Sequence, residues 1–339
     1  METLIATSLS EKSARASAPR FFFVLFSACM MPLLVLGILK VGFEDRFAPT
    51  NAGVSGLLAA DQDVDLLFIG SSHTRQSYDV AMVEHETGAS SFLVAYDGTD
   101  LVTIDQVISF LGARNRCPRH VVVEAYSAFL SRPPDFEDPR LFFDAPPPLK
   151  EQIVSTYLST HKRTDAYLDV FDLATSRGSE SLLTYPANRL VLERLSYHGG
   201  TVANTNSGVS RAEFNGFRPE RLSGQPDPHQ LAAANHLVDF ARSRGIQLIF
   251  IESPLPAPVG ADSRIQALKS AFRTWTEAHN QPYIDGDRLF PTNDPTLFAD
   301  SNHLSSAGRR LFTQSLAGSL RQWLGRSSER ADLSRTNPP

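Results

Sequence analysis

The sequence has little cysteine and no excess of positive charge. Its 339 residues include two cysteines, Cys29 and Cys117. Cys29 lies in an apolar N-terminal stretch and Cys117 stands alone in the rest, so we expect no intramolecular disulfide. The count also excludes a disulfide framework and a cysteine zinc site. The net charge of -5 and the pI near 6.0 argue against a nucleic-acid binder, which normally carries a basic face.

One long uncharged run is present near the N-terminus, from Phe21 to Leu39. About 20 apolar residues span the ~30 Å hydrocarbon core of a membrane. A cleaved signal peptide is the alternative, but its apolar part should measure only about 7–15 residues and end in an Ala-x-Ala-like site. We therefore predict a cytoplasmic N-terminus over 1–19 and an uncleaved transmembrane anchor over 20–42. Basic residues before the run favour an extracytoplasmic (periplasmic) location for everything after it.

The remainder of the chain is apolar enough for a sizeable core, since 42% of all residues are hydrophobic. After a predicted linker over 43–62, apolar strand-like runs alternate with stretches of helical periodicity. The strand-like runs are Asp65–Ile69, Ser91–Ala95, His120–Glu124, Ile246–Glu252 and Pro282–Asp285. The helical stretches are Tyr78–Thr87, Leu101–Ala113, Asp227–Arg244, Ser263–His279 and Ser305–Leu324. This alternation predicts an α/β fold, a three-layer α/β/α sandwich with a mainly parallel sheet.

We assign the range 63–325 to this domain. The alternation breaks over 127–225, where proline clusters and further helical patterns occur. Because the same pattern resumes afterwards, we interpret this stretch as an insertion, and insertions at strand ends often build a substrate cleft. The polar end, 326–339, is predicted to be disordered.

A serine follows the first predicted strand, in Phe68-Ile-Gly-Ser-Ser-His-Thr74. The carboxyl end of a parallel strand is where α/β proteins bind ligands, so Ser72 can be a nucleophile if a base reaches it. The alternative is that Ser71 or Ser72 merely caps the next helix. His73 is too close in sequence to be the base, and we expect it at most to line the site.

A second motif opens the last helix, in Asp300-Ser-Asn-His-Leu-Ser-Ser-Ala-Gly308. In such a loop His303 can face the serine while Asp300 orients its ring. The alternative is a capping Asp beside an incidental His.

Together the two motifs resemble the SGNH (GDSL-type) hydrolase superfamily, whose first block is roughly Gly-Asp-Ser-x-Thr and whose last is Asp-x-x-His. The resemblance covers about 65–125 and 230–325. It implies Ser72 as nucleophile, His303 as general base and acid, and Asp300 as its orienting carboxylate. Ser71 stands where the family usually has Asp. This variant and the anchor are similar to an extracytoplasmic branch that includes alginate O-acetylation and teichoic-acid D-alanylation proteins.

The same resemblance implies an oxyanion hole from the backbone N–H groups of Ser72 and Gly98, the latter in Tyr96-Asp97-Gly98-Thr99 after the second strand. An ordinary turn glycine is the alternative. Ser71, His73 and Asp97 are predicted to line the substrate site. The family's Gly-x-Asn-Asp block after the third strand is missing, and the chain instead reads Val123-Glu-Ala-Tyr-Ser127 where that strand ends. One oxyanion donor is therefore unaccounted for, and the role of Glu124 is left open.

These features predict a membrane-anchored serine esterase or O-acyltransferase that acts, through an acyl-enzyme at Ser72, on acyl (acetyl) groups of a cell-surface polysaccharide. The predicted partners are that polymer or its acyl donor, with acyl groups delivered by a membrane-bound O-acyltransferase; no cofactor and no metal is expected. One alternative is a non-catalytic polysaccharide-binding or assembly protein on a degenerate SGNH fold. Another is a metal-dependent phosphoesterase.

Other polar residues are predicted to have ordinary roles. His229 and His236 are predicted on a helix surface, and Arg309 and Arg310 on a solvated helix face. Asp285-Gly-Asp287 lacks the longer acidic spacing of a cation loop.

Overall fold

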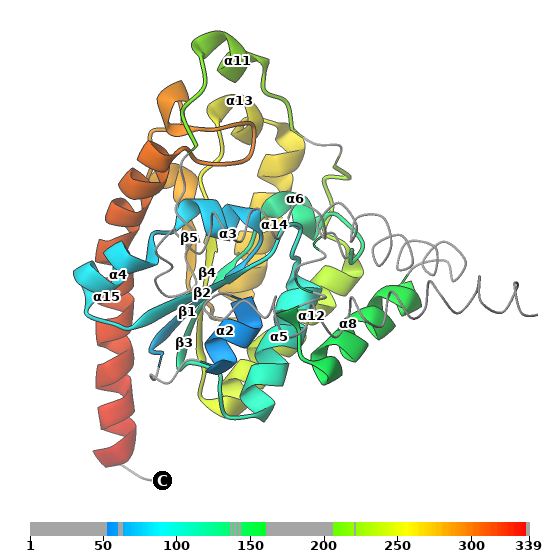
Figure 1. Ribbon diagram of the computed structural model, residues 1–339, viewed down its shortest axis with the longest axis vertical. Helices are drawn as coiled ribbons and strands as arrows, with labels where there is room; N and C mark the ends of the chain where they lie inside the picture. The colour runs from blue at the N-terminus through cyan, green and yellow to red at the C-terminus, as the bar shows by residue number, and fades with distance from the viewer. Residues whose placement is uncertain are drawn as a thin grey trace, which may run out of the picture. The chain divides into compact units, whose positions relative to one another are not determined.

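A parallel sheet forms the centre of the part of the chain that the structure describes (Figure 1). This computed structural model describes residues 53–59, 64–135, 138, 141, 144–160, 206–219 and 222–336. The strands are β1 (Leu66–Gly70), β2 (Ser91–Ala95), β3 (His120–Glu124), β4 (Gln247–Glu252) and β5 (Tyr283–Asp285). Within these ranges the sheet has the order β2-β1-β3-β4-β5, and every neighbouring pair is parallel. The predicted strands and the predicted parallel sheet are confirmed.

Helices cover both faces of the sheet. They are α2 (Gly53–Ala59), α3 (Ser72–Ser77), α4 (Val80–Thr87), α5 (Leu101–Ala113), α6 (Ser127–Leu130), α8 (Pro147–Thr160), α11 (Arg211–Gly216), α12 (Pro228–Arg244), α13 (Ala257–Gly260), α14 (Ser263–Ala278) and α15 (Ser306–Thr336). Short 3-10 helices η2 (Gly286–Arg288) and η3 (Pro295–Leu297) precede α15. Figure 1 shows α15 and α4 on one side of the sheet and α5 and α12 on the other, as the three-layer prediction requires.

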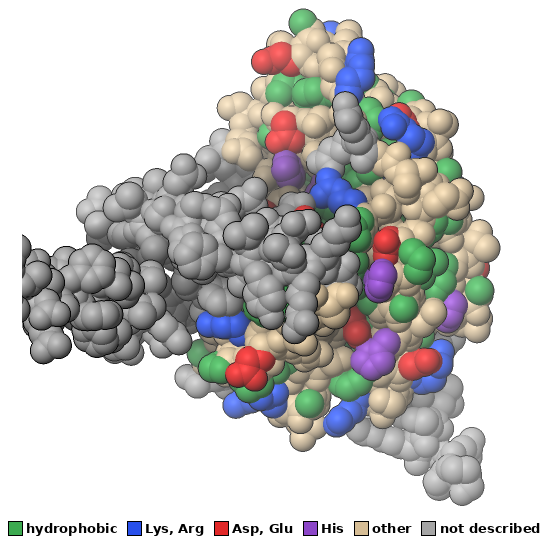
Figure 2. Space-filling view, turned by 90° about the vertical axis from the view of Figure 1, so that its right-hand side faces the viewer, with side chains coloured by type: hydrophobic (Ala, Val, Ile, Leu, Met, Phe, Trp, Pro, Cys, Tyr) green, Lys and Arg blue, Asp and Glu red, His purple; other side chains and the backbone are tan. Residues whose placement is uncertain are grey.

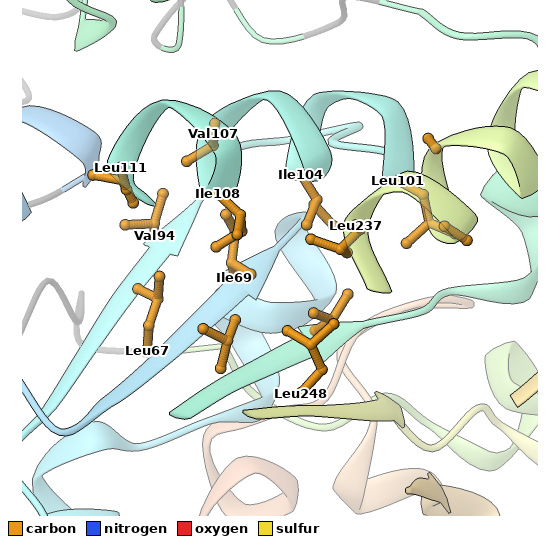
Figure 3. Close-up of a cluster of buried hydrophobic side chains, with 14 of the residues drawn as sticks. Leu67, Ile69, Val94, Leu101, Ile104, Val107, Ile108, Leu111, Leu237 and Leu248 are labelled. Carbon is orange, nitrogen blue, oxygen red and sulfur yellow. The ribbon is translucent and has the colours of Figure 1, made fainter. Parts of the chain in front are cut away.

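Alternation along the strands divides the core into two halves. In β1, Leu67 and Ile69 join the cluster that packs under α5 and α12, whereas Leu66 and Phe68 join the cluster under α4 and α15. All four side chains are essentially buried, as expected for a strand covered on both faces. Figure 3 shows the first of these clusters, with the apolar side of α5 lying over the strands.

Two stretches differ from the domain boundaries predicted above. Helix α2 lies inside the predicted linker, and its Val54 and Leu57 are buried in the core, so the domain begins at least as early as Gly53. Helix α15 continues to Thr336, into the tail that was predicted to be disordered. Among the described helices none is long and apolar enough to cross a membrane. The predicted anchor over 20–42, the segment 1–19 and most of the insertion lie outside the described residues.

Candidate active site

The turn after β1 contains Ser71 and Ser72, for which the sequence left two roles open, helix cap and nucleophile. Ser71 is the N-cap of α3, and its hydroxyl accepts a hydrogen bond from the His73 backbone N–H at 3.2 Å. Ser72 is the first helical residue, so its own hydroxyl is not needed for the cap. A Cβ on Gly70 would collide with the Thr74 hydroxyl and the Glu124 Cβ, which explains the glycine before the pair. Ser71 therefore has the capping role, and the role of Ser72 as nucleophile stays a prediction.

The second motif brings His303 onto Ser72, although 231 positions separate them. Its Nε2 lies 2.8 Å from the Ser72 hydroxyl oxygen. Its Nδ1 lies 2.8 Å and 3.0 Å from the two carboxylate oxygens of Asp300. The loop is closed by a bridge between Phe298 and Leu304 and by a 2.8 Å bond from the Ala299 N–H to the His303 carbonyl. The three side chains thus have the mutual arrangement of a Ser-His-Asp triad.

The Asp300 carboxylate is held ionised. Burial opposes ionisation, but the hydrogen bond and charge of His303 outweigh it and lower the pKa of Asp300. Backbone N–H groups of Asn302 and His303 also donate to it, at 2.7 Å and 2.9 Å. An ionised acceptor at Nδ1 places the ring proton there and leaves Nε2 free to accept from the serine hydroxyl. This is the tautomer that a general base for Ser72 requires.

The Gly98 turn lies at the same sheet edge as Ser72. Gly70 and Ala95 are directly paired in the register of β1 and β2, and the Tyr96 N–H donates to the Gly70 carbonyl at 3.2 Å. Gly98 has φ +68°, a left-handed conformation that favours glycine. Ser72 opens α3, where a backbone N–H has no acceptor inside the helix. The turn therefore stands where the second oxyanion donor was predicted, and both oxyanion assignments stay predictions.

The residues predicted to line the substrate site have definite contacts in the structure. Asp97 forms an ion pair with Arg75 at 2.7 Å and is half-exposed. His73 is buried, stacks on Tyr126 with ring centroids 3.8 Å apart, and lies 5.2 Å from the His303 ring. Burial and the nearby His303 lower the pKa of His73 well below its usual value, so it is neutral. Of these residues Asp97 is the most open to solvent.

The end of β3 and the residues that follow it form buried polar contacts where the family block is missing. Glu124 accepts from the Tyr78 hydroxyl at 2.5 Å and from the N–H and hydroxyl of Ser253, both at 2.8 Å. Burial raises the pKa of Glu124 to about 7. Tyr126 donates to the Asn302 side-chain oxygen at 3.2 Å and so supports the His303 loop. A Glu ending an apolar strand was the only sequence signal for this network, and it did not identify the partners.

Three minor predictions can be compared with the structure. Arg309 is buried rather than solvated: α15 packs against the end of α3, and the Arg309 Nε donates to the Tyr78 carbonyl at 2.9 Å. That prediction was wrong, whereas Arg310 is exposed as predicted. His236 is largely exposed and pairs with Asp105 at 2.8 Å. In the Asp285-Gly-Asp287 segment, which was not predicted to be a cation loop, Asp287 forms an ion pair with Lys269 at 2.6 Å.

Comparisons with known proteins give structural neighbours only. No family model and no curated protein matches the sequence. A protein named as an SGNH hydrolase from Slackia heliotrinireducens is 13% identical, with a TM-score of 0.40, over 76% of this chain and 100% of that one. A GDSL-like lipase from Bacteroides thetaiotaomicron is 10% identical, with a TM-score of 0.38, over 82% and 97%. A mutant of an acetyl-xylooligosaccharide esterase from a Geobacillus species is 13% identical, with a TM-score of 0.35, over 75% and 92%.

The order of the site residues along the chain matches the resemblance that the two motifs indicated. The serine follows β1, the glycine turn follows β2, and the Asp-x-x-His loop directly precedes the last helix. The described part of the chain has a parallel sheet between two helical layers, which is the architecture that the resemblance implied.

Proposed function

We propose that this protein is a serine hydrolase or acyltransferase that cleaves acyl esters through an acyl-enzyme at Ser72. The observation that carries the proposal is the 2.8 Å contact between Ser72 Oγ and His303 Nε2, on a ring whose other nitrogen lies 2.8 Å from Asp300. A serine hydroxyl is a poor nucleophile until an adjacent base takes its proton. His303 is the proposed base, and the contact of its Nδ1 with Asp300 supports the tautomer that this role requires.

The reaction follows from the positions of these groups. His303 takes the Ser72 proton as the hydroxyl oxygen attacks the ester carbonyl, and Asp300 stabilises the imidazolium that forms. The N–H groups of Ser72 and Gly98 are the proposed donors to the oxyanion. His303 then protonates the departing alcohol, which leaves an acyl-serine. Water, or a second hydroxyl, then attacks the acyl carbonyl while His303 takes its proton. His303 returns this proton to the Ser72 oxygen as the bond to the acyl group breaks, which releases the acid or the new ester and restores the free serine.

The location and the substrate belong to the same proposal. The apolar run over 20–42 supports a single-pass anchor in the cytoplasmic membrane with the catalytic domain on its outer side. A tethered enzyme there would meet cell-surface polysaccharides, and acetyl is the acyl group that the motif resemblance implies. A membrane-bound O-acyltransferase is the proposed donor partner. Transfer would be favoured over hydrolysis where the site excludes water and holds a sugar hydroxyl.

A fluorophosphonate probe tests the proposal directly, because it reacts with activated serines. We expect covalent labelling of the wild-type chain at Ser72 and hydrolysis of an acetyl ester such as 4-nitrophenyl acetate. Ser72→Ala should abolish labelling and lower turnover by about 10³-fold or more without unfolding the domain. Ser315→Ala is the matched control, because this exposed serine of α15 donates to the Leu311 carbonyl at 2.9 Å and its loss leaves the nucleophile in place. An unlabelled wild-type protein that still binds polysaccharide would replace the proposal by the non-catalytic alternative.

A further inference from the structure

Helix α2 is fastened at its N-terminus by a residue of the insertion. The Asp144 carboxylate accepts from the Val54 N–H at 2.6 Å and from the Ser55 N–H at 3.3 Å. The Ser55 hydroxyl donates to the Asp144 carbonyl at 2.5 Å. Asp144 is only 4% exposed. A carboxylate on the free N–H groups of a helix is a stabilising cap, strengthened when it is shielded from solvent.

The same carboxylate is bonded to the strand end that leads into the Gly98 turn. The Tyr96 hydroxyl donates to Asp144 and accepts from the Val54 N–H at 2.8 Å. Gly53 has φ +66°, and a Cβ there would collide with both the Asp144 carboxylate and the Tyr96 hydroxyl. The glycine therefore allows the helix end to approach. We call these contacts of Asp144 and Tyr96 with α2 the α2 cap.

Two further insertion residues reach the same turn. Asp138, buried like Asp144, accepts from the Asp97 N–H at 2.6 Å. The Asp135 N–H donates to the Asp100 carboxylate at 3.3 Å. Arg75, on helix α3, also pairs with Asp97 at 2.7 Å. The residues before and after Gly98 are thus tied to α2, to the insertion and to α3.

We propose that the α2 cap and Asp138 are positioning elements that hold the Gly98 N–H in the direction needed by the oxyanion. This rests on the proposed function. An oxyanion donor must lie about 2.7–3.1 Å from the developing charge, and a missing donor costs about 10²–10³ in turnover. Glycine has no side chain of its own to fix the turn, so its orientation depends on its neighbours. These are Tyr96, Asp97 and Thr99, whose hydroxyl donates to the Tyr96 carbonyl at 2.9 Å. The start of the domain and the insertion therefore contribute to catalysis without touching substrate.

The test uses the full chain and three substitutions that leave the triad intact: Tyr96→Phe, Gly53→Ala and Asp138→Asn. Tyr96→Phe removes only the hydroxyl and keeps the ring in the core. Asp262→Asn is the matched control, because Asp262 caps α14 through the Arg264 N–H at 2.9 Å, away from the turn. Amide hydrogen exchange over 96–100 measures how well the turn is ordered. The kcat and KM on an acetyl ester measure whether the order of the turn affects catalysis.

We expect exchange at the turn to quicken about tenfold or more in the three variants, with unchanged exchange in β3 and β4. We expect kcat to fall by about tenfold or more while KM stays within about twofold, and Asp262→Asn to change neither. Wild-type exchange at the turn in Tyr96→Phe and Asp138→Asn would overturn the proposal. So would an equal loss in Asp262→Asn, which would indicate general destabilisation. If the wild-type chain proves inactive, the proposed function fails, and the exchange data alone still decide whether these contacts order the turn.

Discussion

Replacing the buried Glu124 by Gln should change how the stability of the protein depends on pH. Burial raises the pKa of Glu124 from 4.5 to about 7. Between these values the folded state keeps a proton that the unfolded state has lost, so this group's contribution is complete below about pH 4.5 and is lost as the pH rises through 7. At 1.36 kcal/mol per pKa unit, the loss is about 3 kcal/mol in the free energy of unfolding. Gln imitates the protonated form, because its amide can donate to Tyr78 or Ser253 while its oxygen accepts from the Ser253 N–H.

The assay is urea unfolding of both proteins at pH 4.5, 6 and 8, followed by tryptophan fluorescence. All other titrating groups are common to the two proteins, so the difference between them isolates Glu124. The wild-type free energy of unfolding should fall relative to Glu124→Gln by about 3 kcal/mol from pH 4.5 to 8. Glu151→Gln, at an exposed position of α8, controls for the loss of one charge. A difference that is constant over this pH range would refute the assignment of a raised pKa to Glu124.

Three further substitutions test the rest of the site. Asp300→Asn should lower kcat on an acetyl ester by about 10²–10⁴ with little change in KM, because the ring would lose its orienting charge; a loss in KM alone would contradict this role. Gly70→Ala should destabilise the fold by about 1–3 kcal/mol in urea unfolding, since its Cβ has no room beside Thr74 and Glu124; wild-type stability would contradict the packing. Arg309→Met should cost about 1–3 kcal/mol, because the Tyr78 carbonyl loses its donor; the exposed Arg310→Met is its control.

Local periodicity was sufficient to predict most of the sheet and its helices. The strand Ser91–Ala95 and the helix Leu101–Ala113 have the predicted bounds, because an apolar run and a 3.6-residue repeat are properties of short windows. Helix α2 was missed since seven residues give too short a window, and what holds it is Asp144, far along the chain. Arg309 was misplaced because its charge indicated solvent, whereas α3 and α15 bury it against a carbonyl. Contacts between distant segments therefore account for these errors.

Some residues of the candidate site could be predicted from the sequence and others could not, and this difference has a physical reason. The meeting of Ser72 and His303 could be predicted, because a nucleophile and its base would need particular residue types at the end of a strand and in a loop before a helix. The contacts that hold the Gly98 turn need only an acceptor at the right place, and Asp, Glu, a carbonyl or a hydroxyl can supply it. Asp138 and Asp144 therefore leave no pattern in the sequence, although each bonds a residue next to the turn. A group that reacts must be of a particular residue type, and the sequence shows residue type. A group that positions it must only lie at a particular place, and that place is known only from the folded chain.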